Sequence, residues 1–165
     1  MTQPPSLLYP SSTAITSTNT VLSYKSNLVM TNTMTLEEEK MSEAFTKFHI
    51  KGLPFDAVLH RFTGVDNEDP HDHPFGFTSF VIKGWYTERV YDTDGNWKYI
   101  HRKAGDSFRV EASTIHHIVE VSEGGCWTIV LPEKHERKSG FYRFGDETMH
   151  RFWDETEFKP LKQMP

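Results

Sequence analysis

The chain has 165 residues, a formal net charge of -5 and 36% hydrophobic residues. This length fits one ordinary domain with a substantial core, and the mean hydropathy of -0.58 argues against an integral membrane protein. Lys and Arg residues do not cluster, so charge gives no reason to expect binding to nucleic acid or to an anionic membrane.

Cys126 is the only cysteine. An intrachain disulfide and a cysteine-based zinc site are therefore excluded, which fits a reducing compartment. Met1 to Pro10 has neither the cationic start nor the continuous apolar run of a signal peptide. We therefore expect a cytoplasmic protein.

The first 34 residues differ in composition from the rest. Between Ser11 and Thr35, fifteen of twenty-five residues are Ser, Thr or Asn. Within this stretch Val21 to Met30 carries apolar residues with a period of two, so it can be an extended arm as well as a mobile tail. We expect residues 1–34 to form an arm or tail and residues 35–165 to form the domain.

A short helix is predicted at the start of the domain. Thr35-Leu-Glu-Glu38 has the form of a capping box, in which the threonine and the glutamate each satisfy a free backbone amide. Met41, Ala44, Phe45 and Phe48 then recur at helical spacing, and Gly52-Leu-Pro54 ends the run.

From Phe55 onward, short β-type segments alternate with turn residues. Asp92-Thr-Asp-Gly95 is a hairpin signal, and Gly84 and Gly105 indicate further corners. The predicted strands are 57–63, 77–83, 86–91, 97–103, 107–110, 115–121, 127–131, 141–144 and 150–153. Many short strands without intervening helices predict an all-β protein, built as a closed antiparallel sandwich or barrel.

The pair His71-Asp-His73 has the spacing of two metal ligands. Residues i and i+2 of an extended segment project from the same face, roughly 7 Å apart at Cα, so both imidazoles can reach one ion. Asp72 between them should point the opposite way, and we expect it in a turn or at the surface. Cys126 lies in an apolar segment and is interpreted as a buried core thiol. His60 can line the barrel, although packing or exposure explains it equally well.

The run from His71-Asp-His73 to Gly84, followed by Gly105 and His116 eleven residues apart, resembles the two motifs of the cupin superfamily. The resemblance implies a single-domain jelly-roll barrel. The sequence from His71 to Glu88, together with Cys126-Trp-Thr-Ile-Val-Leu131, is similar to that of uncharacterised single-domain cupins of bacterial and phage genomes. More distantly it resembles thiol dioxygenases of the cysteine dioxygenase type, which bind iron through three histidines.

The resemblance assigns the metal ligands as His71, His73 and His116, although a one-residue slip in the last strand would exchange His116 for His117. The position at which cupins usually carry a glutamate ligand is occupied by Phe77. Glu88 is the best remaining candidate acid by position. It can be a metal ligand or a partner that orients a histidine, or it can be a solvated charge on an outward face. The remaining histidines 49, 101, 135 and 150 have no partner at ligand spacing, and we expect them at the surface.

Three neutral imidazoles leave open positions on a metal, which suits iron(II) or a catalytic zinc. We expect a divalent metal, iron(II) first, with zinc, nickel or manganese as alternatives. Two functions stay open: an iron(II)-dependent dioxygenase or related small-molecule oxidoreductase, and a non-catalytic cupin that binds a small molecule or has a structural role. Because cupins often pair through N-terminal strands, the resemblance also suggests a homodimer.

Overall fold

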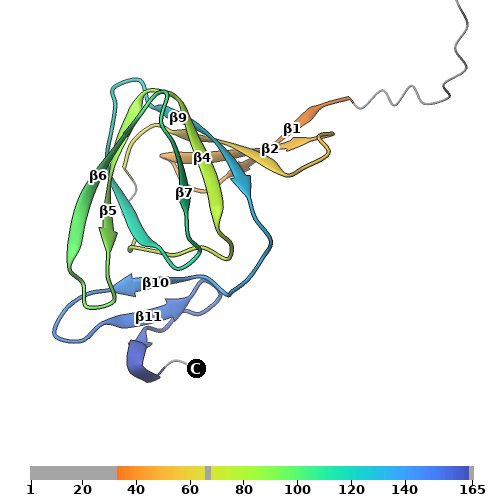
Figure 1. Ribbon diagram of the computed structural model, residues 1–165. Coiled ribbons are helices and arrows are strands. Elements are labelled where there is room, and N and C mark those ends of the chain that lie inside the picture. The colour runs from red at the N-terminus through yellow and green to blue at the C-terminus, as the bar shows by residue number, and fades with distance from the viewer. Residues whose placement is uncertain (1–32, 66–67, 164–165) are drawn as a thin grey trace, which may run out of the picture. The chain divides into compact units, whose positions relative to one another are not determined.

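The computed structural model describes residues 33–65 and 68–163, and this part of the chain is built of strands (Figure 1). It contains twelve strands, a single 3-10 turn at Leu161–Gln163, and no α-helix among the described residues. Accordingly, no described helix is long and apolar enough to cross a membrane. The strands are β1 (Thr35–Lys40), β2 (Phe45–Lys51), β3 (Ala57–Phe62), β4 (Phe77–Lys83), β5 (Trp85–Tyr91), β6 (Trp97–Lys103), β7 (Ser107–Val110), β8 (Ile115–Val121), β9 (Cys126–Pro132), β10 (Gly140–Arg143), β11 (Met149–Phe152) and β12 (Lys159–Pro160).

Three antiparallel sheets organise these strands. One has the order β1-β2-β3-β9-β4-β7, the second β6-β5-β8 and the third β10-β11-β12. The first two form the barrel (Figure 1), and one core cluster joins Val81 of β4 and Cys126 of β9 to Tyr86 of β5. The order is that of a jelly roll, in which sequence neighbours such as β3 and β4 are separated by β9. The all-β barrel prediction is confirmed.

Alternation along the strands sorts residues between the barrel interior and its outer surface. On β9 the buried residues are Cys126, Thr128 and Val130, which pair in register with Phe62, His60 and Val58 of β3. Burial raises the pKa of the Cys126 thiol to about 11, so this cysteine is an inert core residue, as the sequence predicts.

The predicted helix at Thr35 to Phe48 is wrong, because this segment forms the β1–β2 hairpin. Phe45 stacks on Phe62 at 4.7 Å between ring centroids, whereas Phe48 packs against Trp127 on the opposite face. The partners lie 17 and 79 residues away in the sequence, beyond the reach of a helical turn. Contacts that a strand makes on both faces therefore outweigh a local helical pattern.

Two turns follow the sequence prediction. The backbone amide of Asp92 donates to the carbonyl of Asn96, which closes the β5–β6 hairpin with Gly95 at a φ of 85°. Gly84 has a φ of 73°, and any side chain there would collide with the carbonyl of Gly125. The predicted arm at Val21 to Met30 lies outside the described residues, so the division of the chain at residue 34 stays a prediction.

The third sheet lies across one end of the barrel (Figure 1). This sheet is attached to the barrel through the segment before β4, where His71 forms isolated β-bridges with both His116 and Phe141. The backbone amide of Tyr142 donates to the carbonyl of Pro70 at 2.7 Å. The loop that carries the predicted ligands is thus held between β8 of the barrel and β10 of the third sheet.

Candidate metal centre

The three predicted ligands come together in space. His71 and His116 exchange backbone hydrogen bonds of 3.0 and 2.9 Å, and the amide of His73 donates to the carbonyl of Ala112 at 2.9 Å. These bonds fix the loop before β4 against the start of β8. One ligand atom from each histidine lies within 4.8 Å of the others, a spacing that permits a shared metal ion.

The spacing of the ring nitrogens fits a metal ion. Nε2 of His73 lies 2.8 Å from Nε2 of His116. When two imidazoles bind one ion with a nitrogen–metal–nitrogen angle of about 90° and bonds of about 2.0 to 2.1 Å, their ligand nitrogens lie about 2.9 Å apart. In addition, Nδ1 of His71 is buried without a hydrogen-bond partner in the described part of the chain. The donor set and its geometry therefore suit a divalent cation.

Burial keeps the imidazoles in the form that binds metal. It lowers the pKa of His71 to about 3, an effect that the nearby His116 reinforces. Burial likewise holds the pKa of His73 well below its usual value, with further contributions from His116 and His71. Both rings are neutral near pH 7 and present a lone pair, which metal ligation requires.

Glu88 is a buried partner of His116 rather than a solvated charge. Its side chain is only 3% exposed, and its Oε2 lies 2.7 Å from Nδ1 of His116. Nε of Arg102 donates to Oε1 at 3.0 Å. Burial alone would raise the pKa of Glu88, but the hydrogen bonds from His116 and Arg102 hold it below its usual value. The ionised carboxylate therefore keeps the proton of His116 on Nδ1 and directs Nε2 into the cluster.

An apolar side chain occupies the place of the usual cupin glutamate. Phe77 is buried, and its ring meets that of His73 edge-on at 4.9 Å between centroids. The metal-binding group within the described residues contains no carboxylate and does not include His117. Between the two alternatives for the third ligand, the geometry favours His116.

Asp72 lies neither in a turn nor at the surface, contrary to the prediction from the sequence. It does point away from the cluster, but it is only 3% exposed. Its carboxylate accepts hydrogen bonds of 2.7 Å from the amide of Gly140 and the hydroxyl of Tyr142, and Arg137 forms an ion pair with it at 2.9 Å. Asp72 thus ties the ligand loop to the third sheet.

Three further polar residues are buried or half-buried. His60 faces the barrel interior, where burial lowers its pKa to about 3. Lys47, opposite His60 in the β2–β3 register, is close enough to His71 and His73 to lower the pKa of both. The alternation of β2 would have revealed Lys47 had this segment been recognised as a strand. His150, predicted at the surface, is 3% exposed, because it packs on Tyr142 of the neighbouring strand.

Comparisons with known proteins rest on structure alone. No family model matches the sequence, and neither does any curated protein. Bacillus subtilis oxalate decarboxylase, a protein with Mn(II) centres, is similar with a TM-score of 0.50 and 16% identity, over 62% of this chain and 28% of that one. The Lactobacillus farciminis oxalate decarboxylase–formate complex gives a TM-score of 0.50 and 18% identity, over 62% and 31%. Hydroxypropylphosphonic acid epoxidase from S. wedmorenis gives 0.47 and 17%, over 59% and 55%.

The chain therefore corresponds to about a quarter to a half of the length of these proteins. At such identities the likeness concerns the fold, which is the cupin jelly roll. Fold and site together define a jelly-roll barrel that carries a three-histidine cluster of metal-binding geometry.

Proposed function

We propose that this protein is an iron(II)-dependent oxidoreductase of the dioxygenase type that acts on a small molecule. His71, His73 and His116 hold the metal. The observation that carries the proposal is the convergence of three imidazoles with no carboxylate among them. Such a neutral donor set leaves the full charge of the ion and several coordination positions for substrate and oxygen.

The surrounding residues have separate roles in this proposal. Glu88 fixes the tautomer and the orientation of His116. Phe77 covers one side of His73 and limits the access of water. Lys47 and His60 face the same interior from β2 and β3, so they contact a substrate that lies beside the cluster. Iron(II), when bound, supplies the reactivity towards dioxygen that no side chain of the chain offers.

The fold comparison supports a metal role only in general terms, because the Mn(II) centres of the Bacillus subtilis enzyme occur on the same architecture. Manganese, zinc and nickel are therefore tested beside iron.

Metal analysis of the purified full chain tests the proposal. We expect one iron per chain after anaerobic loading, and oxygen uptake when small thiols or oxoacids are added. Iron retention without uptake on any of these compounds would favour the non-catalytic alternative. Protein that stays metal-free after loading with iron, manganese, zinc and nickel would overturn the proposal.

A further inference from the structure

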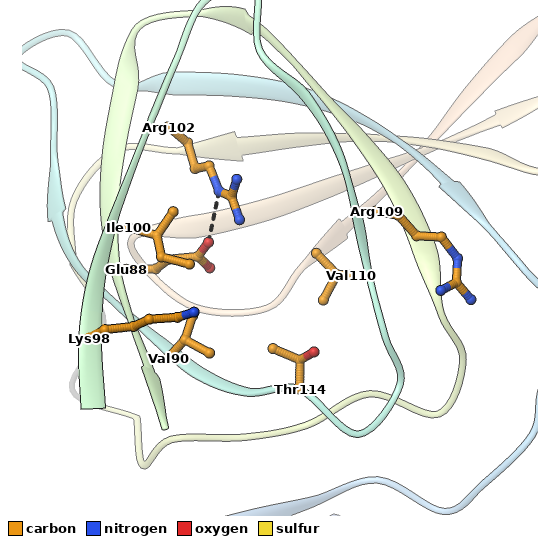
Figure 2. A pocket seen from close by; sticks show the side chains of 8 residues that line it. All are labelled: Glu88, Val90, Lys98, Ile100, Arg102, Arg109, Val110 and Thr114. Atoms are coloured by element: carbon orange, nitrogen blue, oxygen red, sulfur yellow. Dashed lines mark hydrogen bonds and ion pairs between the residues drawn. The ribbon is translucent and has the colours of Figure 1, made fainter. Parts of the chain in front are cut away.

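A cavity lies in the side of the barrel, and the histidine cluster is not part of its lining. Its volume is about 180 Å³, and it opens between β6 and β7, the edge strands of the two barrel sheets. Figure 2 shows Glu88, Lys98 and Arg102 on one side of it and Val110 and Thr114 on the other. None of the three clustered histidines lines it. A ligand there is therefore separated from the metal cluster by Glu88.

Arg102 presents a fixed and partly unused guanidinium to this cavity. The group lies over the ring of Phe108, 3.7 Å from its centroid, and its Nε is bonded to Glu88. In the described part of the chain its two terminal nitrogens have no hydrogen-bond partner. A guanidinium held in this way offers two parallel donors, which match the two oxygens of a carboxylate.

Lys98 adds a second cation at some distance from the first. It lies on the same face of β6 as Arg102, four residues away, and its side chain extends towards the cavity (Figure 2). No carboxylate of the described residues forms an ion pair with it. Arg109 also borders the cavity, but its guanidinium points away in Figure 2 and is paired with Glu111 and Glu133.

The wall of the cavity between the two cations is apolar. Val90, Ile100 and Val110 line the cavity there. Apart from Arg109, which is paired with Glu111 and Glu133, the lining has two cations, Lys98 and Arg102, and one anion, Glu88, in a chain whose net charge is -5. Positive ends with an apolar middle fit an anion that has a short hydrocarbon part, and the small volume excludes a large ligand.

We propose that this side cavity binds a short aliphatic carboxylate, whose carboxylate pairs with Arg102 and whose methylene groups lie along Val90, Ile100 and Val110. Lys98 holds a second carboxylate where the ligand has one, so a dicarboxylate binds more tightly than a monocarboxylate of the same length. The site is distinct from the metal cluster and does not depend on the proposed oxidoreductase activity.

Titration of the full chain with glutarate and with valerate, at constant ionic strength, tests this proposal. Calorimetry gives the affinities, and amide chemical shifts locate the site. We expect saturable binding that shifts amides of β5, β6 and β7, with glutarate bound about two to five times more tightly, as one exposed charge pair allows. Lys98→Met should remove the preference for glutarate and leave valerate binding unchanged.

Lys103→Met is the matched control, because Lys103 lies on the opposite, outer face of β6, and it should change neither affinity. The same titrations on the His73→Ala variant separate this site from the metal cluster, because both acids should still bind to that variant. Lack of saturable binding of either acid would overturn the proposal. So would equal effects of the two lysine variants, or loss of binding in His73→Ala.

Discussion

The Oε2 atom of Glu88 lies 2.7 Å from Nδ1 of His116, in a part of the barrel that solvent hardly reaches. Because the carboxylate is ionised, it accepts a hydrogen bond from the N–H at Nδ1, which leaves the Nε2 lone pair of His116 facing His73. The metal-binding form of this histidine is therefore set before any ion arrives.

Glu88→Gln should weaken metal binding by about tenfold to a hundredfold. The amide group of the glutamine can donate to Nδ1, which favours the tautomer with its proton on Nε2 and blocks the ligand atom. Competition with a chromophoric chelator measures the affinity. Glu123→Gln, at an exposed turn, is the control. Equal affinities for the two variants would show that Glu88 does not orient His116.

His73→Ala should abolish metal retention, whereas His117→Ala should leave it intact. His116 lies inside the barrel in contact with His73, and the adjacent His117 faces the other side of β8. Metal content per folded chain, measured after gel filtration, checks the pair, and circular dichroism confirms folding. Loss of metal in His117→Ala alone would mean that the register of β8 differs in solution.

Much of the barrel could be predicted from the sequence, because its signals are local. The strands 77–83, 97–103, 107–110 and 115–121 have the predicted bounds, since period-two alternation between turn residues determines where such strands begin and end. The grouping of His71 and His73 is predicted for the same reason, because it follows from their spacing alone, and the structure brings the two side chains together.

The parts that the sequence did not reveal depend on long-range contacts. The burial of Asp72 is determined by Gly140, Tyr142 and Arg137, about seventy residues away. The link between Glu88 and His116 depends on the pairing of β5 with β8, which includes a register shift between Thr87 and Glu88. Neither contact leaves a periodic signal in the sequence.

Tyr142→Phe should lower the free energy of unfolding by about 1 to 3 kcal/mol. The change removes a hydrogen bond to a buried carboxylate and leaves one oxygen of Asp72 less well satisfied. The wild-type bond has a measurable signature, because burial together with Asp72 raises the pKa of Tyr142. Urea denaturation checks the loss, and Tyr99→Phe, at an exposed tyrosine, should change stability by less than about 0.5 kcal/mol. Equal stability of the two variants would contradict a structural role for this bond.

His60 should make the protein sensitive to acid. Its pKa is about 3 in the folded state and about 6.5 when unfolded, so between these values the unfolded chain binds more protons. Stability contributed by the neutral ring is therefore complete above about pH 6.5 and is lost as the pH falls towards 3, by at most about 1.4 kcal/mol per pH unit.

Denaturant titrations of metal-free protein between pH 7 and 4 measure this slope. His60→Gln should reduce it, because glutamine does not titrate, whereas His101→Gln, at an exposed position, should not. An unchanged slope in His60→Gln would place His60 in contact with solvent.

Lys47→Met should stabilise the protein by about 0.5 to 1.5 kcal/mol at pH 7. Burial lowers the pKa of Lys47, an effect that Glu39 and Glu68 only partly oppose. Holding the ammonium group inside the barrel therefore costs free energy, which a methionine of similar length does not incur. The advantage of the variant should shrink as the pH rises towards 10.5, because the lysine then becomes neutral in the folded state first.

Lys51→Met is the matched control on β2, since Lys51 is exposed and pairs with Glu37 at 3.3 Å, and it should change stability by less than about 0.5 kcal/mol. Thermal and urea denaturation at pH 7 and pH 10 compare the variants. A Lys47→Met protein less stable than wild type would mean that the ammonium group is well paired in solution. In that case Lys47 supports the barrel, and its place beside His71 and His73 would no longer mark it as a residue that contacts substrate.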